Sequence, residues 1–172
     1  MKRIHLSRRS FIKGAIASGI APTFIPAHLL GADSPSNRLT VGFIGVGGHG
    51  IGRNLKHYLR QKDARVLTVC DVDRSRMPAA KKMVDEKYGN DDCSMTTDFR
   101  EVLARPDIDT VMISTPDHWH TLMSVLAVRA GKDVQCEKPT LTIDEGKMLV
   151  SEIRRHNKVF QTSTEDRSVP VY

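Results

Sequence analysis

The feature that most constrains the fold of this chain is a glycine-rich loop between an apolar segment and the start of a predicted helix. Residues 45–50 read GVGGHG, which has the spacing G-x-G-x-x-G. The apolar run at 39–44 precedes this loop, and a helical pattern over about 51–61 follows it. Glycines at this spacing let a strand, a tight turn and a helix pack closely, so the loop predicts the first unit of a parallel α/β sheet.

The alternation of strand and helix continues through the rest of the chain. Short runs rich in β-branched and apolar residues predict strands at 39–44, 66–70, 94–96, 110–114, 134–136 and 159–162. Amphipathic segments predict helices at about 51–61, 75–88, 98–104, 118–130 and 143–156. Strands that alternate with helices form parallel sheets with both faces covered, so we expect an α/β fold with a doubly wound parallel sheet.

The glycine loop is also a predicted seat for a diphosphate. Gly45 permits the tight turn, Gly47 the close approach of the backbone to a ligand, and Gly50 the close packing of helix on sheet. Gly48 and His49 complete the loop, and the helix that follows offers unpaired N–H groups and the positive end of its dipole. We therefore expect these five residues to bind the phosphates of a dinucleotide. The alternative is a glycine-rich turn that binds no ligand.

Asp71 follows the second predicted strand, 21 positions after Gly50. A carboxylate at this point accepts hydrogen bonds from the ribose hydroxyls of an adenosine. This favours NAD as the cofactor, because the 2′-phosphate of NADP would lie beside a like charge. Arg74 and Arg76 are near enough in the sequence to weaken that repulsion, so NADP is the second choice.

Two further loops follow predicted strands and are rich in polar side chains. Residues 115–120 read TPDHWH, and residues 137–139 read EKP. Ligands of doubly wound sheets bind beyond the carboxyl ends of the strands, so we expect both loops to line the same site as the glycine loop. His118 and His120 are also candidate metal ligands, but no third ligand lies at a suitable spacing, and we predict no metal site. Trp119 is interpreted as a packing residue rather than a stacking platform.

The combination of these motifs is similar to the amino-terminal half of the glucose-fructose oxidoreductase, inositol dehydrogenase and MocA family of NAD(P)-dependent oxidoreductases. The resemblance rests on the G-x-G-x-x-G loop, the strand followed by Asp71, the TPDHWH segment with its helix ending in AGK, and the EKP segment. It extends from about Leu39 to Arg167. It implies a Rossmann fold, NAD as the cofactor, and hydride transfer with a hydroxyl of a sugar or polyol.

The resemblance also implies roles for the residues of the two later loops. The loop beneath the nicotinamide and its ribose corresponds to Thr115, Pro116, His118 and His120. The Glu-Lys-Pro signature of the family, which also meets the cofactor, corresponds to Glu137, Lys138 and Pro139. Lys138 is then the catalytic residue, since an ammonium beside a substrate hydroxyl favours the deprotonated form of that hydroxyl. Pro139 shapes the turn that aims Lys138, and a cis bond before Pro139 is one of two available isomers. The alternative for Lys138 is a solvated charge at the end of a strand.

The first 32 residues have the composition of an export signal. They combine a basic start, which includes the segment SRRSFIKG, with a long run that carries no charge. The paired Arg8 and Arg9 resemble the twin-arginine export signal. We therefore expect residues 1–32 to be a signal peptide read by the twin-arginine translocase, residues 33–38 to be a linker, and the protein to be periplasmic or extracytoplasmic. The alternative is a disordered basic tail.

The net charge of +6 at pH 7 originates in this leader. The leader holds five basic residues and no acidic residue, whereas residues 33–172 carry 21 basic against 20 acidic side chains. The predicted folded part is therefore nearly neutral, which argues against nucleic acid as a partner.

Members of the family that this sequence resembles continue into a second α/β domain, which supplies the substrate pocket and the oligomer interface. We interpret residues 39–167 as the dinucleotide-binding domain and residues 168–172 as the truncated start of the second domain. On this interpretation the chain alone binds a dinucleotide without turning over substrate, and a homo-oligomer forms only in the full-length protein. Two alternatives are open: an exported NAD-dependent glycosidase and a non-catalytic dinucleotide-binding fragment.

Overall fold

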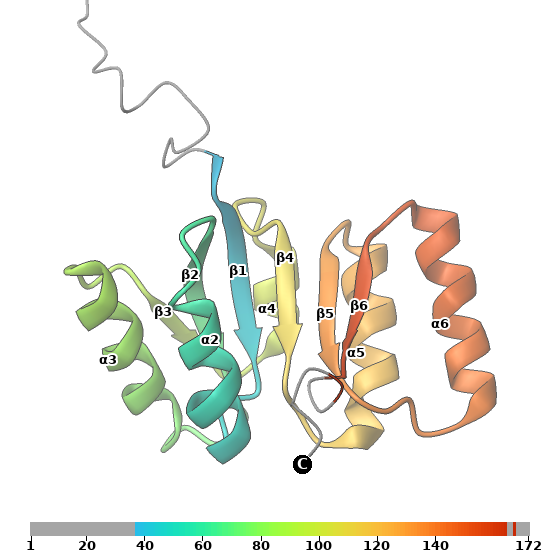
Figure 1. The fold of residues 1–172 in the computed structure, drawn as a ribbon, viewed down its shortest axis with the longest axis horizontal. Helices are drawn as coiled ribbons and strands as arrows, with labels where there is room; N and C mark the ends of the chain where they lie inside the picture. The colour runs from blue at the N-terminus through green and yellow to red at the C-terminus, as the bar shows by residue number, and fades with distance from the viewer. Residues whose placement is uncertain (1–36, 165–166, 168–172) are drawn as a thin grey trace, which may run out of the picture. The chain divides into compact units, whose positions relative to one another are not determined.

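The computed structural model of the protein describes residues 37–164 and residue 167 of the 172-residue chain. The predicted signal peptide at 1–32, most of the predicted linker and the predicted start of a second domain at 168–172 lie outside these residues. Figure 1 shows the described part as a sheet with helices packed against it.

Six parallel strands form the sheet, in the order β3-β2-β1-β4-β5-β6 (Figure 1). Their bounds are β1 (Leu39–Ile44), β2 (Ala64–Cys70), β3 (Ser94–Thr96), β4 (Thr110–Ile113), β5 (Asp133–Glu137) and β6 (Phe160–Ser163). Each coincides with a predicted strand to within two residues at either end. The direction of winding reverses between β1 and β4, and this switch point opens a crevice at the carboxyl ends of the strands.

Helices cover both faces of the sheet, which confirms the predicted doubly wound α/β fold. Their bounds are α3 (Met77–Tyr88), α4 (Phe99–Ala104), α5 (Asp117–Arg129) and α6 (Ile143–His156), with the first helical segment divided into η3 (Gly50–Leu55) and α2 (Lys56–Tyr58). One buried apolar cluster joins β1 and β2 to α3 and to the first helical segment, with Phe43 and Leu55 fully buried. A second cluster joins β4 and β5 to α4 and α5, with Ile113 and Val128 fully buried.

The first helical segment differs from the single helix predicted at about 51–61. Its first six residues, η3, form a π-helix, and one α-helical turn, α2, follows and ends at Tyr58. Glycine lowers α-helical stability by about 1 kcal/mol relative to alanine, and this stretch contains both Gly50 and Gly52. The wider turn of the π-helix carries Asn54 to the sheet, where its side chain is buried.

Local sequence signals set the ends of the other helices. Thr142 and Glu145 form a capping box at the start of α6, in which each backbone N–H donates to the other residue's side chain over 2.9 and 3.2 Å. Gly89 ends α3 in the left-handed conformation, with φ of 68°. No helix in the described residues is long and apolar enough to cross a membrane.

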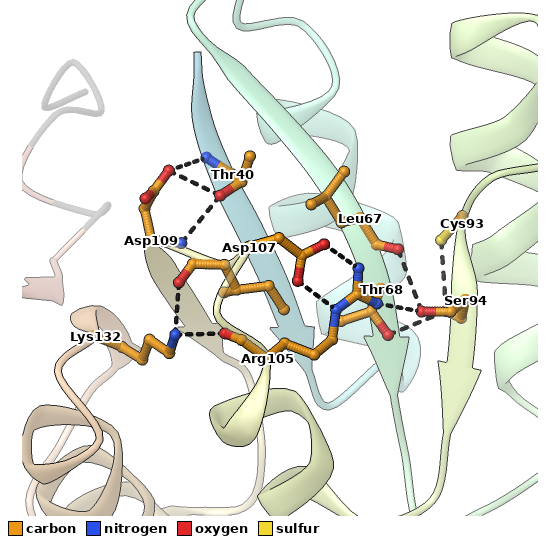
Figure 2. A network of polar contacts seen from close by, with 10 residues as sticks. Thr40, Leu67, Thr68, Cys93, Ser94, Arg105, Asp107, Asp109 and Lys132 are labelled. Carbon is orange, nitrogen blue, oxygen red and sulfur yellow. Dashed lines mark hydrogen bonds and ion pairs between the residues drawn. The ribbon is translucent and has the colours of Figure 1, made fainter. Parts of the chain in front are cut away.

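The amino ends of the strands are joined by a network of polar contacts (Figure 2). Lys132 is buried, and its Nζ donates to the carbonyl oxygens of Arg105 and Ile108 over 2.6 and 2.7 Å. Thr40 of β1 and Asp109 before β4 exchange three hydrogen bonds of 2.8 to 3.0 Å. These contacts tie β1, β4 and β5 together at the edge opposite the carboxyl ends of the strands.

Candidate functional site

A cleft of about 700 Å³ lies at the carboxyl edge of the sheet, around the switch point. The glycine loop forms its floor, the end of β2 and the segment after β3 form one side, and the segment after β4 forms the other. The residues that line the cleft include Gly45, Gly47, Gly48, His49, Gly50, Asp71, Arg76, Phe99, Arg100, Ser114, Thr115, Pro116 and Trp119. The structure therefore brings together the glycine loop, the acidic residue after β2 and the first part of the TPDHWH segment, as the sequence predicted.

The glycine loop has the close packing that its spacing indicates. Gly45 has φ of 91°, a conformation that residues with side chains rarely adopt. A Cβ atom at Gly50 would lie 2.2 Å from the carbonyl oxygen of Gly45, so no larger residue fits there without moving the loop. Gly48 has open space where a Cβ would be. The loop is thus a bare stretch of backbone that faces the cleft.

Asp71 joins the end of β2 to the glycine loop. Its buried carboxylate accepts a hydrogen bond from the backbone N–H of Val46 through Oδ2 and one from Asp73 through Oδ1, each over 2.9 Å. An ionised carboxylate has about four lone-pair positions, so two further bonds to ribose hydroxyls are compatible with this arrangement. The predicted contact between Asp71 and a ribose stays a prediction, and the structure adds a second role for Asp71 in fixing the loop.

Cys70 lies beside Asp71 at the wall of the cleft and is buried. Burial, together with the neighbouring charge of Asp71, raises the pKa of the Cys70 thiol to about 12. Burial therefore favours the protonated thiol, which is a poor nucleophile. Cys93 and Cys136 are also buried free thiols.

The segment after β4 contributes polar and aromatic groups to the cleft. The Oγ1 atom of Thr115 is buried and has no hydrogen-bond partner among the described residues. A ligand group in the cleft would supply the missing partner. Trp119 lines the cleft with 39% of its surface exposed, which corrects its interpretation as a packing residue.

His120 is buried and lies between the segments that follow β4 and β5. Its Nε2 is 2.7 Å from the carbonyl oxygen of Thr115, and its Nδ1 is 2.9 Å from that of Pro139. A neutral imidazole donates through one nitrogen only, and a protonated one through both. His120 thus bridges the two segments from below and is not among the lining residues of the cleft.

Glu137, at the end of β5, is buried and belongs to a polar cluster beneath the glycine loop. Its Oε1 accepts a hydrogen bond of 2.8 Å from the amide of Asn54, which also donates to the Ser114 hydroxyl over 2.9 Å. The Nε2 atom of His49 lies 3.4 Å from the same carboxylate oxygen. The cluster connects the glycine loop, the first helical segment and the ends of β4 and β5.

Lys138, Pro139 and His118 are exposed, and the cleft-lining residues do not include them. The peptide bond between Lys138 and Pro139 is cis, which is one of the two isomers expected. The ring of His118 lies 5.9 Å from that of Trp119. Among the described residues no group of three or more histidine, cysteine or acidic side chains is arranged to hold a metal ion.

Several residues of the site were not found from the sequence. Asn54 carries no recognisable motif, and its role depends on the π-helical turn. Phe99 and Arg100 line the far end of the cleft because β3 lies next to β2, a pairing that no local pattern encodes. The position of Arg76 five residues after Asp71 indicated that it lies near the cofactor site. Its approach to the glycine loop is seen only in the structure.

Comparison with known proteins agrees with this geometry. Residues 39–164 match the family GFO_IDH_MocA, described as an oxidoreductase family with an NAD-binding Rossmann fold. Glycosyl hydrolase family 109 protein 2 from Shewanella sp. (strain ANA-3) is 33% identical over 160 residues, which cover 80% of this chain and 35% of that protein.

Solved structures show the same fold. The crystal structure of myo-inositol 2-dehydrogenase from Lactobacillus plantarum is similar with a TM-score of 0.67 and 26% identity, and the match covers 77% of this chain and 38% of that one. KijD10, a 3-ketoreductase from Actinomadura kijaniata solved with NADP and TDP-benzene, has a TM-score of 0.64 at 23% identity. The chain spans little more than a third of the length of these relatives. Because the family match covers most of the chain, the protein belongs to the Gfo/Idh/MocA oxidoreductase family and contains its NAD-binding Rossmann fold.

Proposed function

We propose that the protein is the cofactor-binding part of an oxidoreductase that exchanges hydride between NAD(P) and a hydroxyl-bearing carbon of a sugar or polyol. The observation that carries this proposal is the cleft in which the glycine loop meets Asp71 and the segment after β4. The substrate class is supported by the similarity to myo-inositol 2-dehydrogenase from Lactobacillus plantarum. Nucleic acid is not proposed as a partner.

The described residues fit a dinucleotide on two independent observations. The glycine loop presents bare backbone to the cleft: Gly48 has open space where a Cβ atom would lie, and Gly50 permits close packing that a Cβ atom, 2.2 Å from the Gly45 carbonyl oxygen, would prevent. At the other end of the cleft, the buried Thr115 hydroxyl lacks a hydrogen-bond partner among the described residues. The first observation suits a diphosphate and the second suits a polar group of the nicotinamide half.

We propose NAD as the preferred cofactor and NADP as the weaker one. The Asp71 carboxylate is fixed by two backbone N–H groups at the end of β2, beside the expected position of the adenosine ribose. A fixed carboxylate accepts hydrogen bonds from ribose hydroxyls and repels a 2′-phosphate.

Bound NAD(P) supplies a nicotinamide ring that accepts or returns a hydride. The proposed role of Lys138 is to bind the substrate hydroxyl with its ammonium and so to favour loss of the hydroxyl proton as the carbon is oxidised. Thr115, Pro116 and His118 are proposed to meet the nicotinamide and its ribose, and Glu137 and Pro139 to shape the adjoining wall. His120 would act by holding Thr115 and Pro139 in place, because both of its ring nitrogens face their carbonyl oxygens.

A glycosidase is the second candidate function, and the similarity to glycosyl hydrolase family 109 proteins favours it. In such a reaction a transient oxidation of the sugar would weaken the glycosidic bond, and the hydride would return at the end, so that the cofactor shows no net change. Both candidates use this cleft and Lys138. They would differ in the pocket that a second domain contributes, which we propose also forms the homo-oligomer interface. A third candidate is a non-catalytic dinucleotide-binding protein.

The test is an assay of the full-length protein with NAD, with NADP, with myo-inositol and other polyols, and with p-nitrophenyl glycosides. Accumulation of reduced cofactor on a polyol supports the oxidoreductase. Release of nitrophenol without net reduction supports the glycosidase. Cofactor binding without either reaction supports the non-catalytic protein and contradicts the first two candidates.

The variant Lys138→Met separates catalysis from binding in that assay. We expect turnover to fall at least about 100-fold, the usual contribution of a positioned acid or base, while NAD affinity changes less than about threefold. Lys147→Met is the matched control, since Lys147 is an exposed lysine of α6 paired with the equally exposed Asp144. Full turnover in Lys138→Met would show that Lys138 is a solvated charge.

A further inference from the structure

The side chain of Arg76 reaches across the cleft to the glycine loop. Its Nη1 lies 3.0 Å from the position that a Cβ atom would occupy at Gly47, and its Cζ lies 3.9 Å from that position. Apart from Gly47 and its two chain neighbours, no other residue of the described part of the chain has a heavy atom within 4 Å of that point. Arg76 and Gly47 both line the cleft, although they belong to different βα units. The missing side chain at Gly47 therefore makes room for a guanidinium as well as for a ligand.

Asp73 holds Arg76 in this position. Its carboxylate pairs with Nε of Arg76 over 3.1 Å, which leaves the Nη1 side of the guanidinium directed at the loop. Asp73 is itself fixed, because Oδ1 accepts hydrogen bonds from the backbone N–H and the hydroxyl of Ser75 over 2.9 and 2.6 Å. These bonds from Ser75 lower the pKa of Asp73, so Asp73 is ionised at neutral pH.

The charges around the loop require a cation if a diphosphate binds there. Asp71 holds a carboxylate against the loop, Asp73 holds a second one 3.1 Å from Nε of Arg76, and Glu137 lies 3.4 Å from His49. A guanidinium offers a rigid fork of donors that matches phosphate oxygens, and it stays charged at any pH of interest. Arg76 is suitably placed to balance the carboxylates and to bind phosphate.

We propose that Arg76 binds the diphosphate of the dinucleotide by closing over Gly47. The proposal rests on the proposed dinucleotide-binding function and adds a residue that the glycine motif does not contain. Two other roles are possible for an arginine after the second strand: binding the 2′-phosphate of NADP, and stacking on the adenine. The position of Nη1 at Gly47, where the backbone approaches the diphosphate, favours the diphosphate over both.

The test is isothermal titration of the full chain and of Arg76→Ala with NAD, NADP and adenosine. A hydrogen bond to a charged group contributes about 1.5–3 kcal/mol, so we expect Arg76→Ala to weaken NAD and NADP alike by roughly tenfold to a hundredfold. Adenosine should bind both proteins equally. A loss confined to NADP would identify a 2′-phosphate contact, and an equal loss for adenosine would identify stacking on the base. Either result, or no loss at all, overturns the proposal.

Arg74→Ala is the matched control, because Arg74 is an exposed arginine of the same loop and does not line the cleft. We expect it to change NAD affinity less than about threefold, the size of a screened surface charge. Arg76→Lys keeps the positive charge but not the forked guanidinium donors, so its loss of NAD affinity should lie between those of Arg74→Ala and Arg76→Ala. Asp73→Asn weakens the ion pair that holds Arg76, so it should lower NAD affinity by less than Arg76→Ala does. If the unmodified chain binds neither dinucleotide, the proposed function itself fails, which is distinct from binding that is unaffected in Arg76→Ala.

Discussion

At the scale of single residues, His120 shows how one buried side chain sets the geometry of the site. It is 2% exposed and bridges the segments after β4 and β5 through two backbone carbonyls. We predict that His120→Leu lowers the free energy of unfolding by about 1–3 kcal/mol for each carbonyl that loses its donor. Urea denaturation followed by circular dichroism measures this loss.

The neighbouring Thr121→Val is the control for this prediction. The hydroxyl of Thr121 is buried and has no hydrogen-bond partner among the described residues, so its removal deletes no described bond. We expect Thr121→Val to be neutral or slightly stabilising. If His120→Leu is equally neutral, the two contacts of the ring do not contribute to stability.

Residues whose function follows from local chemistry could be predicted from the sequence, and residues placed by packing could not. Gly45, Gly50 and Asp71 lie in the cleft because strand, turn and acid follow one another along the chain. Asn54 donates to Ser114 and Glu137, and Arg76 approaches Gly47; these contacts depend on a π-helical turn and on an ion pair. No spacing rule contains either of these features.

At the scale of elements, the two edges of the sheet have separate tasks. The amino edge carries the network around Lys132 (Figure 2). The carboxyl edge carries the cleft. We predict that Lys132→Met lowers the free energy of unfolding by about 1–3 kcal/mol, because the carbonyl oxygens of Arg105 and Ile108 lose the Nζ donor, and that NAD affinity is unchanged. Chemical denaturation and NAD titration of the same variant measure both quantities.

Lys147→Met controls for the loss of a lysine in this prediction. Lys147 is exposed and its ion pair lies in solvent, so we expect Lys147→Met to change the free energy of unfolding by less than about 0.5 kcal/mol. A loss of NAD affinity in Lys132→Met would contradict the separation of the two edges.

The strands and helices themselves were predictable because their signals are periodic. Apolar β-branched runs predicted the strands other than β3, whose sequence SMT is a weaker strand signal, and the capping box at Thr142 predicted the start of α6. The division of the first helical segment was not predictable, because Gly50 and Gly52 weaken the α-helix without specifying what replaces it.

At the scale of the whole molecule, the export signal proposed for residues 1–32 and the proposed cofactor site would be connected by a physical requirement. NAD is available in the cytoplasm and scarce outside the cell, so an exported protein that retains its cofactor must fold around it before crossing the membrane. The twin-arginine pattern at Arg8 and Arg9 matches that requirement. Nearly all of the net charge also lies in residues 1–32, and residues 33–172 are close to neutral.

We therefore predict that replacing Arg8 and Arg9 together with lysine leaves the full-length protein in the cytoplasm. Lysine keeps the charge but not the guanidinium fork, so recognition is lost although the leader stays basic. Immunoblots of periplasmic and cytoplasmic fractions measure the distribution, and Arg3→Lys, in the same basic start, is the control that should be exported normally. The retained protein should bind NAD as tightly as the exported form, because residues 39–164 hold the cleft. Export that is unaffected by the double replacement would contradict recognition of the paired arginines, and with it the proposal that the protein folds around its cofactor before crossing the membrane.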